Sequence, residues 1–226
     1  MKIAVLGTGT VGRAVSGALA HLGHDVVVGT RDPQATLART EPDAMGTAPF
    51  AQWHAAHGEI KVGTYADAAA RADVVVNATN GSGSLEALAA AGAENLSGKV
   101  LMDIANPLDF SHGFPPALNP VNTDSLGEQI QRSFPEVRVV KTLNTMTASV
   151  MVDPASVAGG DHSVFVSGND ADAKDVVSGL LKDFGHRDVI DLGDITSARG
   201  AEMILPIWLR VWGALGTGAF NFKVAR

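Results

Sequence analysis

The sequence predicts an α/β fold of the Rossmann type, in which helices cover both faces of a doubly wound parallel sheet, with a small C-terminal α/β extension. Two observations carry this prediction. Short apolar runs alternate with stretches of helical spacing along residues 1–145, which is typical of parallel strands joined by helices. A glycine-rich turn joins the first apolar run to the first helical stretch. After residue 145 the pattern changes, so we expect residues 1–145 to form a dinucleotide-binding domain and residues 146–226 a smaller α/β part.

The first part of the chain begins with a βαβ unit. Residues 2–6 (KIAVL) are a β-rich run, and residues 11–22 carry small and apolar side chains at helical spacing up to Gly23. Residues 25–28 (DVVV) form the next strand. The same alternation continues along this part. It predicts further strands at 60–64, 73–78, 99–104 and 138–143, and helices at 65–72, 84–91 and 125–134.

The second part has its own short elements. Residues 163–167 (SVFVS) are β-rich, and an Asn/Asp cap begins a helix over 170–184. A strand follows at 188–191, and residues 195–215 predict a long helix that bends near Pro206. We expect the tail, residues 219–226, to pair as an edge strand.

Two segments have no predicted element. Residues 40–58 lie between the second and third predicted strands, and residues 107–124 are rich in Pro, Gly and Asn. Long irregular segments in compact domains are often lids or binding loops. We therefore consider both segments as candidates for covering a site.

The composition excludes several classes of protein. The 226 residues carry a net charge of −7 without a basic run, which argues against nucleic acid or an anionic membrane as partner. The chain has no cysteine, so disulfides, thiolate nucleophiles and cysteine-ligated metals are excluded. The start, MKIAVLGTG, lacks the features of a signal peptide, and no 18-residue apolar run predicts a membrane span. We expect a cytoplasmic protein.

The glycine-rich turn has the spacing of a dinucleotide-binding loop. Gly7, Gly9 and Gly12 fit G-x-G-x-x-G directly after a strand and at the start of a helix. Gly7 permits the tight turn, Gly9 leaves room for a pyrophosphate, and Gly12 lets the helix pack closely on the strand. The free N–H groups at the helix N-terminus then face the phosphates.

The end of the second strand indicates which dinucleotide is bound. Proteins that bind NAD place an acidic residue there for the ribose hydroxyls, but this chain has Thr30 and Arg31. A guanidinium holds a phosphate with two charge-assisted hydrogen bonds. We therefore predict NADP(H), with its 2′-phosphate on Thr30 and Arg31. Asp32, followed by Pro33, is expected to cap the next helix rather than to bind the ribose.

The ends of three other predicted strands define the rest of the cleft, because ligands of such sheets bind at the carboxyl ends of the strands. The residues there are small, polar and uncharged: Ala78, Thr79 and Asn80; Ala105, Asn106 and Pro107; Asn144, Thr145 and Met146. No Lys or His stands among them to donate a proton to a carbonyl substrate. Lys141 is expected, by strand alternation, to point into sheet packing or a helix interface. Arg199 and Glu202 share a helix face, which suits an intrahelical pair or a contact to a cofactor tail.

An uncharged cleft suits direct hydride exchange between two flat rings. That step needs stacking, exclusion of water and close approach of two carbons, and the cofactors supply the chemistry. Asn80, Asn106 and Asn144 are candidates to hold the nicotinamide amide or the carbonyls of the second ring. The alternative is that these asparagines only make loop turns. The histidine pairs at i,i+3 spacing have no third ligand at suitable spacing, so we predict no metal site.

Several segments resemble the NADPH-dependent reductases of the deazaflavin coenzyme F420. These are the glycine turn, the strand ending GTR, TLNTM at 142–146, GGDHSVFVSGND at 159–170, and the C-terminal run from ARGAEM through LPIWLRVWGALG to NFK. The resemblance covers nearly the whole chain. It implies a homodimer, reversible hydride transfer between coenzyme F420 and NADP(H), and a C-terminal part that completes the second-cofactor cleft and the dimer interface.

The resemblance also implies roles by position. It places Thr8, Thr10 and Val11 at the pyrophosphate and the segment from Asn144 to Met146 beside the stacked rings. The chain departs from the family in two respects: some members have His at the position of Asn144, and the 40–58 segment is longer than in compact archaeal members.

Two alternatives to coenzyme F420 remain open from the sequence. The related cytoplasmic domain of membrane ferric reductases also carries Asn-Thr at this point, so the acceptor could be FMN, FAD or a flavin-bound ferric complex. A non-enzymatic module that binds NADP without passing electrons is the other alternative.

Overall fold

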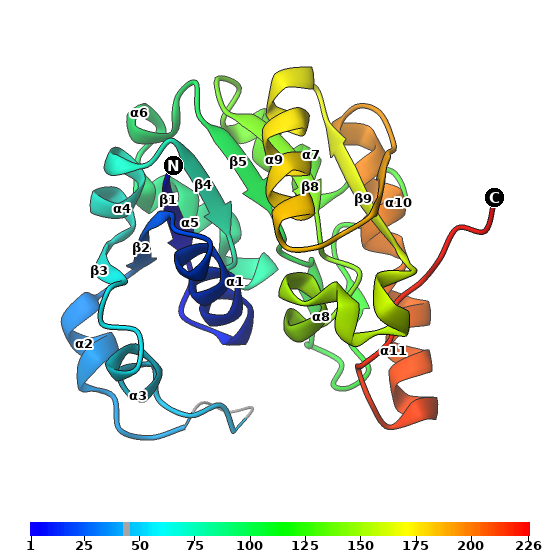
Figure 1. The fold of residues 1–226 in the computed structure, drawn as a ribbon. Helices are drawn as coiled ribbons and strands as arrows, with labels where there is room; N and C mark the ends of the chain where they lie inside the picture. The colour runs from blue at the N-terminus through cyan, green and yellow to red at the C-terminus, as the bar shows by residue number, and fades with distance from the viewer. Residues whose placement is uncertain (43–45) are drawn as a thin grey trace.

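The computed structural model describes residues 1–42 and 46–226, and within these residues eight strands form one sheet (Figure 1). Their order is β10-β9-β8-β5-β4-β1-β2-β3. The strands of this sheet are β1 Lys2–Leu6, β2 Asp25–Thr30, β3 Lys61–Thr64, β4 Val74–Asn77, β5 Val100–Asp103, β8 Arg138–Thr142, β9 Ser163–Gly168 and β10 Asp188–Asp191. The α-helices are α1 Thr10–His21, α2 Pro33–Ala38, α3 Phe50–Ala55, α4 Tyr65–Arg71, α5 Ser84–Ala91, α6 Ala93–Leu96, α7 Leu126–Ser133, α8 Ala148–Val152, α9 Ala171–Asp183, α10 Ala198–Met203 and α11 Leu205–Leu215.

The sheet is doubly wound about its central strand. β1 pairs in parallel with β2 on one side and β4 on the other, so the chain reverses its direction of winding there. The six strands from β3 to β8 are parallel, which confirms the predicted fold class. β9 runs antiparallel to β8, and β10 runs parallel to β9. The C-terminal residues therefore extend the same sheet, and the boundary at residue 145 remains a prediction.

Alternate side chains of each strand enter two separate cores. Ile3 and Val5 of β1 lie in one core with the buried faces of α1, α8 and α9. Ala4 and Leu6 lie in the other core, beneath α4, α5 and α7. Because both faces are covered, the central strands are mostly apolar, and this is the pattern from which the parallel sheet was predicted. Figure 1 shows α1, α8 and α9 on the near side of the sheet.

Several predicted elements need correction. The span predicted as one helix over 195–215 is divided: Ile195–Ser197 form a 3-10 helix, and α10 and α11 follow. The break between α10 and α11 falls at Ile204, near Pro206 as predicted, because the second residue of α11 is this proline, which has no N–H. The tail is not a strand. Its Phe222 carbonyl accepts from the Ser163 N–H (2.9 Å), but no ladder of hydrogen bonds follows.

The two segments without predicted elements contain structure of their own. The 40–58 segment includes α3, and its residues 43–45 lie outside the described part. The 107–124 segment contains a two-stranded hairpin of β6 (Leu108–Asp109) and β7 (Ala117–Leu118). These elements have two to six residues, too few for an apolar period to stand out in the sequence.

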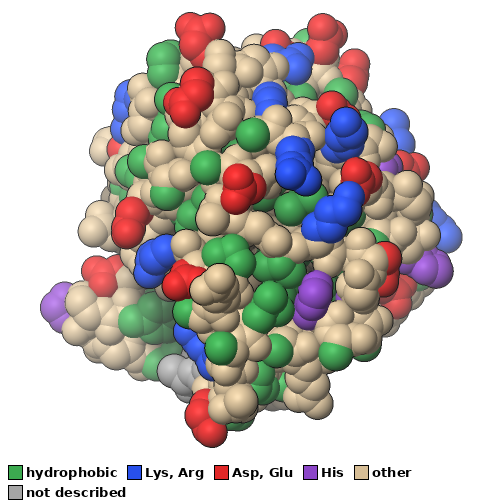
Figure 2. Space-filling model, turned by 90° about the vertical axis from the view of Figure 1, so that its left-hand side faces the viewer, with side chains coloured by type: hydrophobic (Ala, Val, Ile, Leu, Met, Phe, Trp, Pro, Cys, Tyr) green, Lys and Arg blue, Asp and Glu red, His purple; other side chains and the backbone are tan. Residues whose placement is uncertain are grey.

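The length of the helices and the distribution of surface charge are relevant to the predicted cytoplasmic location. Among the described residues, no helix is both long and apolar enough to cross a membrane. On the face that carries α2 and α4, acidic and basic side chains are interspersed and no patch of one sign forms (Figure 2). The cytoplasmic location remains a prediction.

Candidate functional site

The glycine turn joins β1 to α1 at the carboxyl edge of the sheet. Gly7 has φ +125°, and a Cβ atom there would lie 2.4 Å from the Ala78 carbonyl oxygen. A Cβ atom on Gly12 would lie 2.2 Å from the Gly7 carbonyl oxygen, whereas one on Gly9 would meet nothing within 4 Å. Gly7 and Gly12 are therefore required by the fold itself. Gly9 leaves open space at the uncapped N-terminus of α1, where a phosphate would lie.

Arg13 braces this turn, a contact that the sequence did not reveal. Its Nε donates to the Thr8 carbonyl (2.8 Å), and its Nη1 donates to the Ala48 carbonyl (2.6 Å). The Thr10 hydroxyl lies 3.5 Å from that of Thr47. Arg13 therefore connects the described end of the 40–58 segment to the loop expected to hold the pyrophosphate.

Beside the turn, a cavity of about 270 Å³ lies between the ends of β1, β2 and β4. It is lined by Gly7, Thr8, Gly9, Arg31, Tyr65, Ala78, Thr79, Asn80, Gly83 and Ala87. Three of these residues, Tyr65, Gly83 and Ala87, were not predicted. The cavity brings the glycine turn, Arg31 and the end of β4 together, as expected for an adenosine site.

The two residues predicted to bind a 2′-phosphate differ in environment. The Thr30 side chain is buried, and its hydroxyl lies 2.9 Å from that of Thr36. Arg31 is exposed, and its Nη2 lies 3.7 Å from Glu86 Oε1. Asp32 caps α2 by accepting from the Ala35 N–H (2.9 Å), which confirms the predicted cap. Among the described residues, Arg31 makes only this weak surface pair, which leaves it able to turn toward a ligand.

A second cavity, of about 380 Å³, lies between the start of α1, the segments that follow β4 and β5, and helix α8. It is lined by Thr10, Val11, Ala78, Thr79, Asn80, Gly81, Ile104, Ala105, Asn106, Leu108, Phe110, Met146, Thr147, Ala148 and Met151. Within the described chain, no lining residue is titratable. We call this space the ring cavity. Its walls are mostly apolar, and exposed Phe110 of the 107–124 segment stands at its edge.

The predicted ring-positioning residues separate into two groups. Met146 lines the ring cavity, but Asn144 and Thr145 are each 2% exposed and do not line it. Asn144 Nδ2 donates to Asn106 Oδ1 (3.0 Å) and to the Ala201 carbonyl (3.1 Å), and Asn106 Nδ2 donates to the Asn144 carbonyl (2.9 Å). Pro107, also predicted, lies next to Asn106 but is not part of the lining. The asparagine at 144 therefore holds Asn106 rather than facing the cavity.

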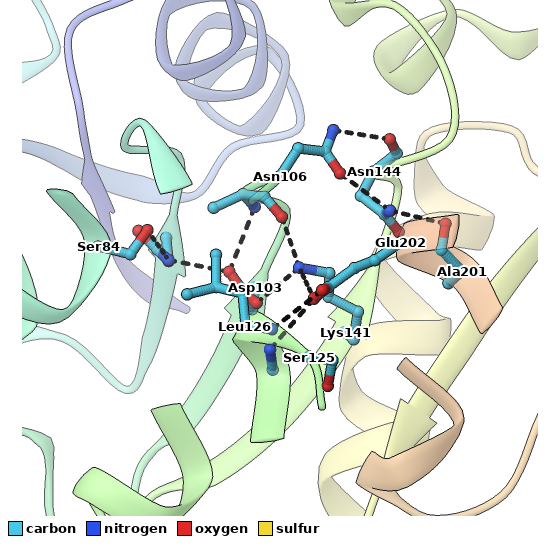
Figure 3. Close-up of polar contacts among 12 residues, drawn as sticks. Ser84, Asp103, Asn106, Ser125, Leu126, Lys141, Asn144, Ala201 and Glu202 are labelled. Atoms are coloured by element: carbon cyan, nitrogen blue, oxygen red, sulfur yellow. Dashed lines mark hydrogen bonds and ion pairs between the residues drawn. The ribbon is translucent and has the colours of Figure 1, made fainter. Parts of the chain in front are cut away.

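Directly behind this pair lies a buried ionic cluster, which Figure 3 shows. Lys141 Nζ lies 2.9 Å from Asp103 Oδ2 and 2.9 Å from Glu202 Oε1, and none of the three side chains is more than 3% exposed. Burial alone lowers the pKa of a lysine, but the adjacent Asp103 and Glu202 carboxylates reverse this effect and hold the pKa of Lys141 above its ordinary value. Lys141 is thus a buried cation. The prediction that it points away from the cleft is confirmed.

Of the two alternatives for Arg199 and Glu202, the intrahelical pair is wrong, and the contact to a cofactor tail remains a prediction. Arg199 Nε donates to Glu128 Oε2 of α7 (2.8 Å), while Glu202 points the other way, toward Lys141. The Arg199 guanidinium beside Glu128 holds the pKa of that carboxyl below its ordinary value. Glu202 pairs with a residue 61 positions away in the sequence, and Arg199 with one 71 positions away. Such pairs are determined by the tertiary fold and not by helical spacing.

Comparison with known proteins places this arrangement in a family. The family model described as "NADP oxidoreductase coenzyme F420-dependent" matches residues 2–107. The F420-dependent NADP reductase of Methanothermobacter marburgensis is 28% identical over 218 residues, covering 93% of this chain and 92% of that protein. The metalloreductase STEAP3 of Rattus norvegicus is 27% identical over 97% of this chain, which spans 40% of the length of that protein.

A solved structure is far more similar. A protein of Arthrobacter sp. FB24, proposed to be an F420-dependent NADP reductase, is 71% identical to this chain, with a TM-score of 0.97 and full coverage of both chains. Identity at this level over the whole length implies the same family as well as the same fold. Together with the matched family model, it shows that this chain is an NADP-dependent oxidoreductase and belongs to the family of F420-dependent NADP reductases.

Proposed function

We propose that the protein transfers a hydride directly between NADP(H) and the deazaflavin coenzyme F420. The observation that carries the proposal is the ring cavity: it adjoins the glycine turn, and its described walls contain no titratable side chain. An uncharged, mostly apolar space suits two stacked rings, because hydride exchange between ring carbons needs no acid or base from the protein.

The residues of the dinucleotide site fit NADP(H). The open space at Gly9 and the uncapped start of α1 suit the pyrophosphate, with Thr8, Thr10, Val11 and the flanking glycines around it. The 270 Å³ cavity, which Arg31 lines, would take the adenosine. Arg31 would bind its 2′-phosphate together with Thr30, which does not line the cavity and whose hydroxyl lies beside that of Thr36. Both cavities are lined by Ala78, Thr79 and Asn80, which would therefore contact the middle of a dinucleotide that spans the two.

In this proposal the bound dinucleotide supplies or accepts the hydride at its nicotinamide ring, and the chain supplies the geometry. Ala105 and Asn106 form the floor of the ring cavity, and Met146 and Met151 lie against it as apolar wall. Asn144 lies behind this floor and is bonded to Asn106, and Pro107 follows Asn106 in the chain. The apolar walls exclude water from the space between the rings, which protects the hydride from protonation.

We also propose that residues 146–226 complete the cleft and form a homodimer interface, as the family resemblance implies. α11 supports this, because Ile207, Trp212 and Leu215 are exposed on it (53%, 36% and 60%). An apolar helical face of this kind usually marks an interaction site. Sedimentation of the wild type would find a dimer, and Ile207→Glu/Leu215→Glu would shift it to monomer. A monomeric wild type would contradict the dimer but not the proposed reaction.

The proposed reaction is tested by mixing the protein with NADPH and one acceptor at a time. NADPH oxidation with coenzyme F420, and not with FMN, FAD or a flavin-bound ferric complex, is the expected result. Oxidation only with a flavin would replace the proposed acceptor, and the STEAP3 match supplies the reason to include the ferric arm. Tight NADPH binding without turnover of any acceptor would instead indicate a non-enzymatic module.

A further inference from the structure

The buried cluster of Lys141, Asp103 and Glu202 is more than a packing feature. Three charged groups in the protein interior carry a large desolvation cost, and apolar residues of similar volume would stabilise a fold as well or better. The cluster also has one negative charge in excess. Glu202 offsets it by accepting from the Leu126 N–H (2.9 Å) and the Gly127 N–H (3.1 Å) at the N-terminus of α7. We therefore look for a role of the cluster in fixing the positions of neighbouring residues rather than in stabilising the fold.

The cluster is bonded to the floor of the ring cavity. Lys141 Nζ donates to the Ala105 carbonyl, and the Ala105 N–H donates to Asp103 Oδ1 (3.2 Å). Both polar groups of this residue are therefore fixed from behind, while Ala105 and Asn106 line the cavity in front. The Asn106 carbonyl also packs against Gly81, where a Cβ atom would lie 2.0 Å away. The floor cannot shift without breaking these contacts.

The same cluster is also bonded to the part of the ring cavity that follows β4. Asn77 Nδ2 donates to Asp103 Oδ1 (2.8 Å), and Asn77 Oδ1 accepts from the Thr79 hydroxyl (2.6 Å). Thr79 lines both the adenosine cavity and the ring cavity. Asp103 thus adds side-chain hydrogen bonds to the backbone pairing that joins the ends of β4 and β5.

Helix α10 reaches the floor by two routes although it lines no part of the cavity. Glu202 acts through Lys141 on Ala105, and the Ala201 carbonyl accepts from Asn144, which is bonded to Asn106 (Figure 3). Glu202 therefore holds Ala105, and its neighbour Ala201 holds the adjacent Asn106. The C-terminal part of the chain determines the shape of a surface that the N-terminal part provides.

We propose that Lys141 is a positioning residue for hydride transfer, and that with Asp103 and Glu202 it holds Ala105 and Asn106 where the nicotinamide must lie. This inference rests on the proposed function for its substrate, but the geometry it invokes concerns the bound nicotinamide alone. A misplacement of about 1 Å in such a floor costs on the order of 100-fold in rate. Binding of NADPH, which rests mainly on phosphate contacts at the other end of the site, should change little.

The test uses a triple variant, Lys141→Met/Asp103→Asn/Glu202→Gln, which removes the charges together so that no ion is left buried without a partner. The matched control is Arg199→Gln/Glu128→Gln, which removes an ion pair between the same helix α10 and α7 that has no bond to the floor. Four quantities are measured: kcat with coenzyme F420, its kinetic isotope effect with NADPH deuterated at C4, the Kd of NADPH, and the fluorescence lifetime of bound NADPH.

In the triple variant we expect kcat to fall about 10- to 100-fold, with the Kd of NADPH within about threefold of wild type. The kinetic isotope effect with NADPH deuterated at C4 should rise, because hydride transfer becomes slower relative to release. The lifetime of bound NADPH should shorten, because the nicotinamide is no longer held. The control double variant should retain the wild-type kcat and lifetime. A folded triple variant with unchanged kcat and unchanged lifetime would overturn the inference.

Two further arms keep the test decisive. If the triple variant does not fold, Lys141→Met/Glu202→Gln takes its place. This variant removes the Lys141 bond to the Ala105 carbonyl but leaves Asp103 its bonds to the Asn77 side chain and the Ala105 N–H. An unchanged kcat and lifetime in that variant would equally overturn the inference. If the wild type does not turn over coenzyme F420, the proposed function fails. The lifetime of bound NADPH in wild type and variant then still decides whether the cluster positions the nicotinamide.

Discussion

Asn144 and Asn106 hold each other by two reciprocal hydrogen bonds: Asn144 Nδ2 donates to Asn106 Oδ1 (3.0 Å), and Asn106 Nδ2 donates to the Asn144 carbonyl (2.9 Å). One of the two lines the ring cavity, and the other is buried behind it. The pair joins the ends of β5 and β8, so its loss should affect both stability and geometry.

Asn144→Ala should destabilise the protein, because Asn106 Oδ1 and the buried Ala201 carbonyl both lose their donor. Each unmade bond to a buried acceptor costs about 1–3 kcal/mol of unfolding free energy. Denaturant unfolding measures the loss. Asn144→Asp is the matched variant, and it should be worse because a carboxylate oxygen would face two acceptors. Equal unfolding midpoints for wild type and both variants would show that the pair contributes nothing.

Gly9→Ala should leave the fold intact but weaken the binding of NADPH. A Cβ atom at Gly9 meets nothing within 4 Å, whereas one at Gly12 would lie 2.2 Å from the Gly7 carbonyl oxygen. Gly12→Ala should therefore lower the melting temperature, and Gly9→Ala should not. Calorimetric titration with NADPH completes the comparison, with Gly58→Ala as a control in which the new Cβ is also unobstructed. Wild-type affinity in Gly9→Ala would place the pyrophosphate elsewhere.

Arg31→Ala should weaken the binding of NADPH far more than that of NADH. A hydrogen bond from a guanidinium to a charged phosphate contributes about 1.5–3 kcal/mol, which corresponds to roughly a 10- to 150-fold change in Kd. Since NADH has no 2′-phosphate, its Kd should stay within about twofold. Glu86→Gln removes the surface partner of Arg31 and should leave NADPH binding unchanged or tighter. Equal weakening of both dinucleotides would mean that Arg31 does not contact the phosphate.

His186 should make the protein less stable as the pH falls below 6.5. Burial holds the pKa of His186 below its ordinary value of 6.5, and the nearby His162 adds to the lowering. Nε2 lies 3.0 Å from the Met151 carbonyl, but Nδ1 is buried and has no partner among the described residues. The unfolded chain takes up a proton near pH 6.5 and the folded chain does not. The stabilisation is therefore complete above that pH and is lost as the pH falls toward the folded pKa.

Urea unfolding of wild type and His186→Gln between pH 8 and pH 5 tests this. The variant should lose less stability on acidification, because Gln can still donate to the Met151 carbonyl and takes up no proton. Exposed His21 provides the control, and His21→Gln should have the wild-type slope. Parallel slopes for wild type and His186→Gln would contradict the prediction.

The elements that the sequence predicted well are those with a local cause. The helix at 84–91 and the strand at 188–191 have the bounds found for α5 and β10, and the Asp32 cap of α2 follows from a side chain and a backbone N–H three residues apart. The glycine turn was predictable for the same reason. In each case the residues that decide the structure are neighbours in the chain.

The features that the sequence did not predict depend on distant residues. α3 and α8 are six and five residues long, and the antiparallel direction of β9 is decided by its pairing with β8 rather than by its own composition. Likewise, nothing near Lys141 in the sequence indicates that Glu202 is its partner. The strand-end positions of Asn106 and Asn144 were evident, but only the fold distinguishes the one that lines the cavity from the one behind it.

The two ends of the candidate site are built from separate sets of hydrogen bonds. Thr30 ends β2, Thr36 lies in α2, and Arg31 lies in the connection between them. The cluster around Lys141 belongs to β5, β8 and α10, and strands β1 and β4 lie between the two sets. Within the described chain, no hydrogen bond or ion pair joins the two sets. A mutant library that redirects the enzyme toward a dinucleotide without the extra phosphate can therefore be confined to the β2 end. Variants selected there should keep the turnover rate of the parent. The preference for one dinucleotide over the other and the turnover rate can therefore be engineered one after the other.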